Sequence, residues 1–134
     1  MFNAEAGKLS DKRQEQIDDV KARALRSNLP KSLRNIINKT TFTYKEDATY
    51  TFDDGKKGTI FGINNFDGTI ELTSDIWVKP INGRSAASEL VETFFHEVQH
   101  SVNTSFVHNY KDGAAEAAYT NSYRDNIKTY YQTR

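Results

Sequence analysis

The chain has no cysteine, only two prolines and no surplus of charge of either sign among its 134 residues. Without cysteine there can be no disulfide framework, no cysteine zinc site and no thiol nucleophile. Lys plus Arg and Asp plus Glu each number 18, so the basic excess of a nucleic-acid-binding domain is missing. No apolar run approaches the roughly 18 residues that a membrane span needs. We therefore expect neither a nucleic-acid partner nor a membrane span.

The first residues, MFNAEAGKLSDKRQ, contain no hydrophobic stretch of the kind found in a secretory signal. No signal peptide is therefore predicted in this chain, and export would need a specialised secretion system or a longer polypeptide. The absence of cysteine leaves the cellular location open, because secreted and cytosolic proteins can both lack it. A length of 134 residues favours one domain, 1–134, with a modest core to which seven tyrosines and eight phenylalanines must contribute.

One stretch, ELVETFFHEVQHSVN at 89–103, carries a motif with a defined chemistry. It contains HEVQH, in which His96 and His100 are four residues apart and would share one face of a helix. That spacing suits two nitrogen ligands of a zinc ion, and Glu97 would project beside them without being a ligand. The alternative is a chance match, with two solvated or capped histidines.

The stretch also has the amphipathic pattern that the motif requires. Its apolar residues recur at helical period and form one broad stripe: Leu90, Val91, Phe94, Phe95, Val98 and Val102. The opposite face holds the two histidines together with Glu89, Glu92, Thr93 and Asn103. A helix of this kind would bury its aromatic side chains in a core and turn its histidines toward a cleft. Ser85 or Ser88 could cap its N-terminus.

The remaining sequence predicts an α+β fold. Helices are expected at 11–27 after an N-cap at Ser10, in a short segment that begins at Pro30, and at 114–132. Between them the period changes to two, which predicts strands near 40–45, 50–52, 59–63 and 69–73, with 76–78 as a further strand or extended segment. We expect three or four antiparallel strands joined by short turns and packed as a small sheet on the helices.

A catalytic zinc usually has three protein ligands and an open fourth position, so a third ligand is needed. The metzincin motif would place glycine at 103 and histidine at 106, where this chain has Asn103 and Phe106. Three candidates remain downstream. Glu116 lies early in the predicted last helix and is preferred, Asp112 resembles a helix cap, and His108 lies in a loop at a spacing that matches no defensible pattern. Glu116 could instead be an acid that stabilises a first helical turn.

HEVQH followed by DGAAEAAYTNSYRDN at 112–126 resembles small zincin metallopeptidases of the gluzincin type, and most nearly the metallopeptidase toxin and effector domains of bacteria. The resemblance covers about 70–124. It implies a minimal zincin-like fold, in which a small twisted, mainly antiparallel sheet packs on the HExxH helix and a C-terminal helix. It also implies Zn²⁺ as the cofactor, held by His96, His100 and Glu116.

The resemblance implies a place for the substrate as well. In such folds a peptide adds to an edge strand above the active-site helix by main-chain hydrogen bonds. Strand 69–73, just upstream of the HExxH helix, is the best match for that edge, with Ile70, Glu71 and Leu72 contacting the substrate. An ordinary half-buried strand is the alternative interpretation.

The resulting prediction is a zinc-dependent metalloendopeptidase that hydrolyses a protein or peptide substrate with zinc-activated water. Glu97 would act as the general base, taking the proton of the water and passing it to the leaving amine. The oxyanion formed on the scissile carbonyl would need a donor besides zinc. Tyr123 is the preferred donor, with Tyr119 and His108 as alternatives.

The resemblance further implies a bacterial toxin or effector domain, secreted or injected, which could be excised from a longer toxin chain and could meet a cognate immunity protein. Two other classes of function remain open. One is a non-catalytic zinc-binding or protein-interaction domain, and the other is a zinc amidase that acts on a cell-wall amide. The presence of Glu97 argues against a purely structural zinc site, because a closed ligand shell has no use for a base.

Overall fold

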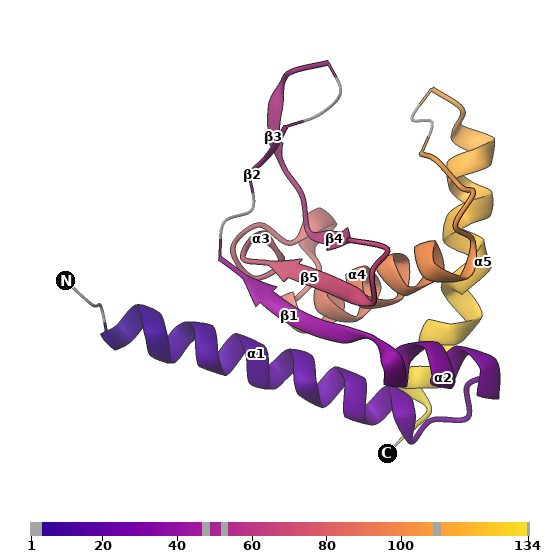
Figure 1. Cartoon of the computed structure of the whole chain (residues 1–134), viewed down its shortest axis with the longest axis horizontal. Coiled ribbons are helices and arrows are strands. Elements are labelled where there is room, and N and C mark those ends of the chain that lie inside the picture. Colours follow the sequence, from indigo (N-terminus) through magenta and orange to yellow (C-terminus); the bar gives the residue numbers. More distant parts are fainter. Residues whose placement is uncertain (1–3, 47–48, 52–53, 109–110, 134) are drawn as a thin grey trace.

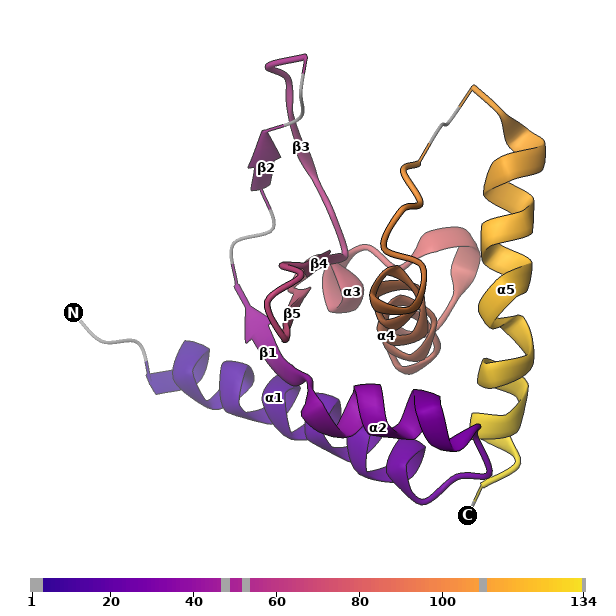
Figure 2. The same cartoon turned by 45° about the vertical axis from the view of Figure 1, so that its right-hand side comes forward.

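The computed structural model describes residues 4–46, 49–51, 54–108 and 111–133. Two helices, α1 (Ala4–Leu25) and α2 (Lys31–Lys39), precede the strands, and the two long helices after them are α4 (Ala86–Val102) and α5 (Gly113–Tyr131). Figure 1 shows α1 running beside β1 (Thr41–Lys45), and Figure 2 shows α4 between the sheet and α5. The predicted α+β class is therefore confirmed, and α4 lies at the centre of the arrangement.

The main sheet has three strands in the order β1, β5 (Thr69–Thr73), β4 (Gly62–Asn64). β1 and β5 are parallel, with Phe42 opposite Ile70, whereas β4 and β5 are antiparallel, with Ile63 opposite Glu71. The prediction of antiparallel strands joined by short turns was wrong for β1 and β5, so the sheet is mixed rather than mainly antiparallel. The chain leaves β1, passes through three other strands, and returns beside β1 in the same direction.

β5 is the middle strand of this sheet, so the prediction that it forms the edge was also wrong. Its Ile70 and Leu72 side chains are 1% and 0% exposed, and Glu71 forms an ion pair with Lys45 at 3.6 Å. Strands on both sides already pair with the backbone of these three residues. The predicted substrate contacts of Ile70, Glu71 and Leu72 by strand addition are therefore not available, and the edge beside α4 is β4.

Other predicted elements differ in extent. The strand expected at 59–63 is divided: β3 (Lys57–Thr59) pairs with β2 (Thr49–Thr51) in a separate antiparallel hairpin, and β4 joins the main sheet. Figure 1 shows this hairpin standing away from the sheet and helices. The segment expected to be extended at 76–78 is instead one helical turn, α3 (Asp75–Val78), followed by a 3-10 turn, η1 (Ile81–Gly83). The first helix begins at Ala4, so Ser10 lies inside it.

The core forms where α4 meets the sheet and the other helices. Five of the six residues in the predicted apolar stripe of α4 are buried, and Val102 at its end is exposed. Phe94 stacks on Phe42 with ring centroids 4.3 Å apart, which joins α4 to β1. Within the described residues, none of the helices combines the length and apolarity needed to cross a membrane. Because the aromatic face of α4 is buried, its histidine face is directed away from the sheet core.

Candidate metal centre

Local sequence determines how α4 begins and which face carries the histidines. Ser85 is the N-cap, and its hydroxyl accepts a hydrogen bond from the backbone N–H of Ser88 at 3.1 Å, as predicted. His96 and His100 follow on one face of the same helix, with ring centroids 5.1 Å apart. The helical spacing of the motif therefore brings the two imidazoles together as expected.

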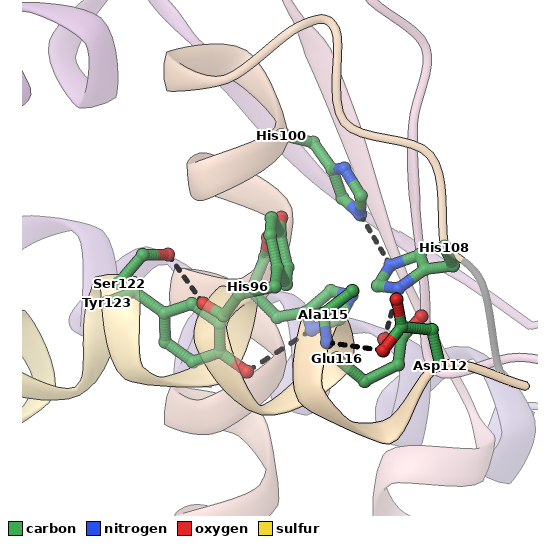
Figure 3. Close-up of polar contacts among 9 residues, drawn as sticks. His96, His100, His108, Asp112, Ala115, Glu116, Ser122 and Tyr123 are labelled. Atoms are coloured by element: carbon green, nitrogen blue, oxygen red, sulfur yellow. Dashed lines mark hydrogen bonds and ion pairs between the residues drawn. The ribbon is translucent and has the colours of Figure 1, made fainter.

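The loop between α4 and α5 brings a third histidine to this pair. Nε2 of His108 lies 3.0 Å from Nε2 of His100, and the rings of His96 and His108 are stacked 5.0 Å apart and nearly parallel. One nitrogen from each of the three rings lies within 4.8 Å of the others. Figure 3 shows the three rings converging from α4 and the loop. This three-histidine cluster can hold a metal ion.

The structure differs here from the preferred sequence prediction. Oε2 of Glu116 lies 2.8 Å from Nδ1 of His108, which is the ring nitrogen that does not face His100. Glu116 therefore contacts the third histidine on its far side, and the side chain that faces the two motif histidines is His108 rather than Glu116. Asp112 caps α5 by accepting a hydrogen bond from the Ala115 N–H at 3.1 Å, in agreement with its predicted alternative role.

From the sequence alone, His108 is a weaker candidate for the third ligand than Glu116. Seven residues of helix end and loop separate His108 from His100, and a loop has no period that predicts where a side chain will point. One feature of the sequence could have identified His108 as a ligand: it is followed by an acid, Glu116, early in the next helix. A histidine that ligates a metal through one nitrogen commonly donates its other N–H to a carboxylate.

Burial sets the protonation state of the two helix histidines. Desolvation is the main reason that the pKa of His96 is lowered to about 4, and repulsion from the neighbouring His100 and His108 adds to this effect. Desolvation, followed by His108, also lowers the pKa of His100 to about 4, although Glu116 acts in the opposite direction. Both imidazoles are therefore neutral near pH 7, which is the form that offers a nitrogen lone pair to a metal.

Glu97 lies deep beside the cluster. Glu97 is only 6% exposed, and this burial raises the pKa of its carboxyl group to about 7. Among the described residues, Glu97 Oε2 and Glu116 Oε1 are buried acceptors without a hydrogen-bond partner. Buried polar atoms normally have partners, so two orphaned carboxylate oxygens around three histidines indicate a site that is completed by a ligand.

A cavity of about 600 Å³ opens over this face of α4. Its walls come from α4, from β4 and the segment before it, from the turn before α4, and from His108 and Tyr123. The α4 residues are Glu89, Glu92, Thr93, His96, Glu97 and His100, and the others are Ile60, Phe61, Gly62, Ile81 and Arg84. Gly62 of the edge strand touches α4 directly. A Cβ at this position would lie 2.9 Å from Glu97 Cγ and 2.9 Å from Thr93 Cγ2, so glycine permits β4 to approach the motif.

Two tyrosines of α5 reach the same helix in different ways. The Tyr123 hydroxyl lies in the cavity wall, 3.3 Å from His96 Nδ1 and 3.3 Å from Glu92 Oε1, and burial raises its pKa above the usual range. Tyr119 donates its hydroxyl hydrogen to the backbone carbonyl of His96 at 2.8 Å and stacks on Phe106. The structure therefore brings Tyr123 to the imidazoles, while the Tyr119 hydroxyl joins α5 to the backbone of α4.

The donor set fits a bound metal. Three imidazole nitrogens, two of them from rings held neutral by burial, are a set that zinc, copper, iron and nickel all accept. Glu116 contacts Nδ1 of His108 and is not part of this three-nitrogen set. In comparisons with known proteins, no family model matches the chain, and neither a curated protein nor a solved structure matches it significantly.

Proposed function

We propose that this chain is a zinc-dependent metalloendopeptidase that hydrolyses peptide bonds in a protein substrate. The observation that supports it most is the convergence of three histidines and the buried carboxyl group of Glu97 in one cavity. His96, His100 and His108 would hold Zn²⁺, with Glu116 behind His108. This ligand set differs from the His-His-Glu set implied by the family resemblance, but it preserves the HExxH arrangement.

The protein residues have defined tasks in this reaction. A zinc ion bound there would polarise the scissile carbonyl and make an attacking water more acidic. Glu97 accepts a proton from that water and returns it to the leaving amine. Its pKa, raised to about 7 by burial, lies close to neutral pH, where a group can both take and give a proton. Glu116 accepts the Nδ1–H of His108, so Nε2 of that ring, which faces His100, carries the lone pair.

The edge strand offers a place for an extended substrate. β4 is the edge of the main sheet, and its Gly62 lies against Glu97 and Thr93 in the wall of the cavity. A peptide could add to this edge by main-chain hydrogen bonds and present its scissile bond above α4. This assigns to β4 the role that sequence reasoning gave to residues 69–73.

The biological setting is proposed from the resemblance of HEVQH and the α5 sequence to bacterial metallopeptidase toxin and effector domains. In that setting the chain would act on a protein of a target cell, reached by secretion or injection. A cognate immunity protein would be the expected inhibitor. Among the described residues, no observation specifically favours the zinc amidase or the non-catalytic domain over the peptidase.

The test combines metal analysis with hydrolysis of an unstructured protein. We expect about one zinc per chain and cleavage that stops when the metal is chelated. Glu97→Gln should keep the zinc and the fold but lose turnover, because an amide cannot accept the proton. Glu15→Gln, which makes the same change on an exposed part of α1, is the matched control and should cleave normally. A chain that takes up no stoichiometric divalent metal after zinc is added would overturn the proposal.

A further inference from the structure

Three side chains form a hydrogen-bonded relay that the reaction described above does not use: Glu92, Tyr123 and His96. Glu92 and His96 are four residues apart on α4, and Tyr123 projects between them from α5. The Tyr123 hydroxyl lies 3.3 Å from Glu92 Oε1 and 3.3 Å from His96 Nδ1. Figure 3 shows Tyr123 directed at His96 from the neighbouring helix.

The hydrogens that the three side chains carry determine which group donates and which accepts in each hydrogen bond of the relay. A carboxylate can only accept hydrogen bonds, and a phenol has one hydrogen to donate. If Tyr123 donates to Glu92, its oxygen is left as an acceptor toward His96. Nδ1 of His96 must then carry the ring hydrogen, and Nε2 keeps its lone pair.

We propose that Glu92 and Tyr123 are positioning residues, which hold His96 as the Nδ1–H tautomer so that Nε2 is presented to the metal. This inference rests on the proposed metal-binding role of the three-histidine cluster. His108 shows the same arrangement in a shorter form, because Glu116 contacts its Nδ1 at 2.8 Å. Two of the three imidazoles are thus supported by a carboxylate, one directly and the other through a phenol.

The relay also changes the role expected for Tyr123. Its single hydrogen is committed to Glu92, so the phenol is not free to stabilise an oxyanion while the relay is formed. Tyr123 then acts on the reaction through His96 rather than on the substrate. The preferred oxyanion donor of the sequence prediction becomes a support for a metal ligand.

The tautomer of His96 can be measured in the metal-free protein by ¹⁵N NMR of the histidine side chains. The wild-type chain should show His96 with its hydrogen on Nδ1. Glu92→Ala removes the acceptor, so the phenol should donate to Nδ1 and move the ring hydrogen to Nε2. Glu92→Gln retains an acceptor oxygen and should restore the wild-type tautomer.

Two further variants make the test independent of folding failures. Tyr123→Phe removes the hydroxyl and should abolish the preference for Nδ1–H. Tyr119→Phe is the matched control on the same helix, because the Tyr119 hydroxyl contacts the backbone of His96 and not its ring. It should leave the tautomer unchanged. A wild-type His96 protonated on Nε2, or a Glu92→Ala protein with an unaltered tautomer, would overturn the relay.

Zinc affinity provides the second measurement, by titration against a competing chelator. Glu92→Ala and Tyr123→Phe should each weaken zinc binding by about 10–100-fold, while Tyr119→Phe binds like the wild type. Glu92→Ala protein with undiminished affinity would refute the relay. If the wild-type chain itself binds no zinc, the proposed function fails, whereas the NMR measurement still decides whether the relay exists.

Discussion

Nδ1 of His108 lies 2.8 Å from Oε2 of Glu116, while Nε2 of the same ring lies 3.0 Å from Nε2 of His100. The third histidine therefore stands between the acid and the two motif histidines. One ring nitrogen faces the motif histidines and the other is held by a carboxylate, which is the orientation that metal-bound histidines usually have.

This relationship predicts different effects of removing His108 and Glu116. His108→Ala should lose stoichiometric zinc, because a missing ligand is not replaced by the other two histidines. Glu116→Gln should keep the metal with an affinity lower by about 10–100-fold. Chelator-competition titrations measure both.

Asp112→Ala, which removes the cap of α5, is the control. It should cost about 1 kcal/mol of stability and leave zinc affinity intact. Loss of zinc in Glu116→Gln with normal binding in His108→Ala would restore the original His-His-Glu assignment.

The contact between Gly62 and α4 predicts that even one methyl group there is harmful. Gly62→Ala would place Cβ 2.9 Å from carbons of Glu97 and Thr93, so the strand or the helix must shift. We expect a loss of about 1–3 kcal/mol in urea unfolding, with a lower kcat because Glu97 moves. Gly113→Ala is the control, since nothing lies within 4 Å of its Cβ position, and it should be close to neutral. Wild-type stability and kcat in Gly62→Ala would contradict the close packing.

Glu97 predicts a pH dependence of the stability of the metal-free protein. Its pKa is raised from 4.5 to about 7 by folding, so the folded state prefers the protonated form. The resulting contribution to stability is fully present below pH 4.5 and is lost as the pH rises through 7. Relative to Glu97→Gln, the wild-type unfolding free energy should therefore fall between these values, by at most about 3 kcal/mol. Denaturant titrations at several pH values, with chelator present, measure this. A difference that stays constant with pH would show that Glu97 is not desolvated.

Tyr119 predicts a change in stability without a change in the site. Its hydroxyl donates to the His96 carbonyl at 2.8 Å, and Tyr119→Phe should cost about 1 kcal/mol when that bond is lost. Thermal and urea unfolding of the metal-free chain measure the cost. Zinc affinity should be unchanged, and a large loss of affinity would mean that Tyr119 belongs to the metal site.

The sequence by itself determined the elements whose physics is local. Residues four apart on a helix lie on one face whatever surrounds them, so His96 and His100 could be paired and the buried stripe of α4 could be identified in advance. Ser85 was one of the two caps predicted for α4, and Asp112 was predicted either as a cap or as a ligand. Both are caps, and they could be named in advance because capping depends on atoms within one turn. Tyr123 was placed on the side of α5 that carries Glu116, and both side chains do reach the imidazoles.

Only the tertiary structure decided which distant residues complete the site. β5 lies between β1 and β4 because the chain returns beside β1 after a long excursion, and no short-range pattern distinguishes a middle strand from an edge strand. His108 reaches His100 through a loop whose path depends on how α5 packs on α4, so the acid with helical context was preferred over it. The pKa values of Glu97 and the helix histidines likewise depend on burial, which is a property of the packed molecule rather than of the motif.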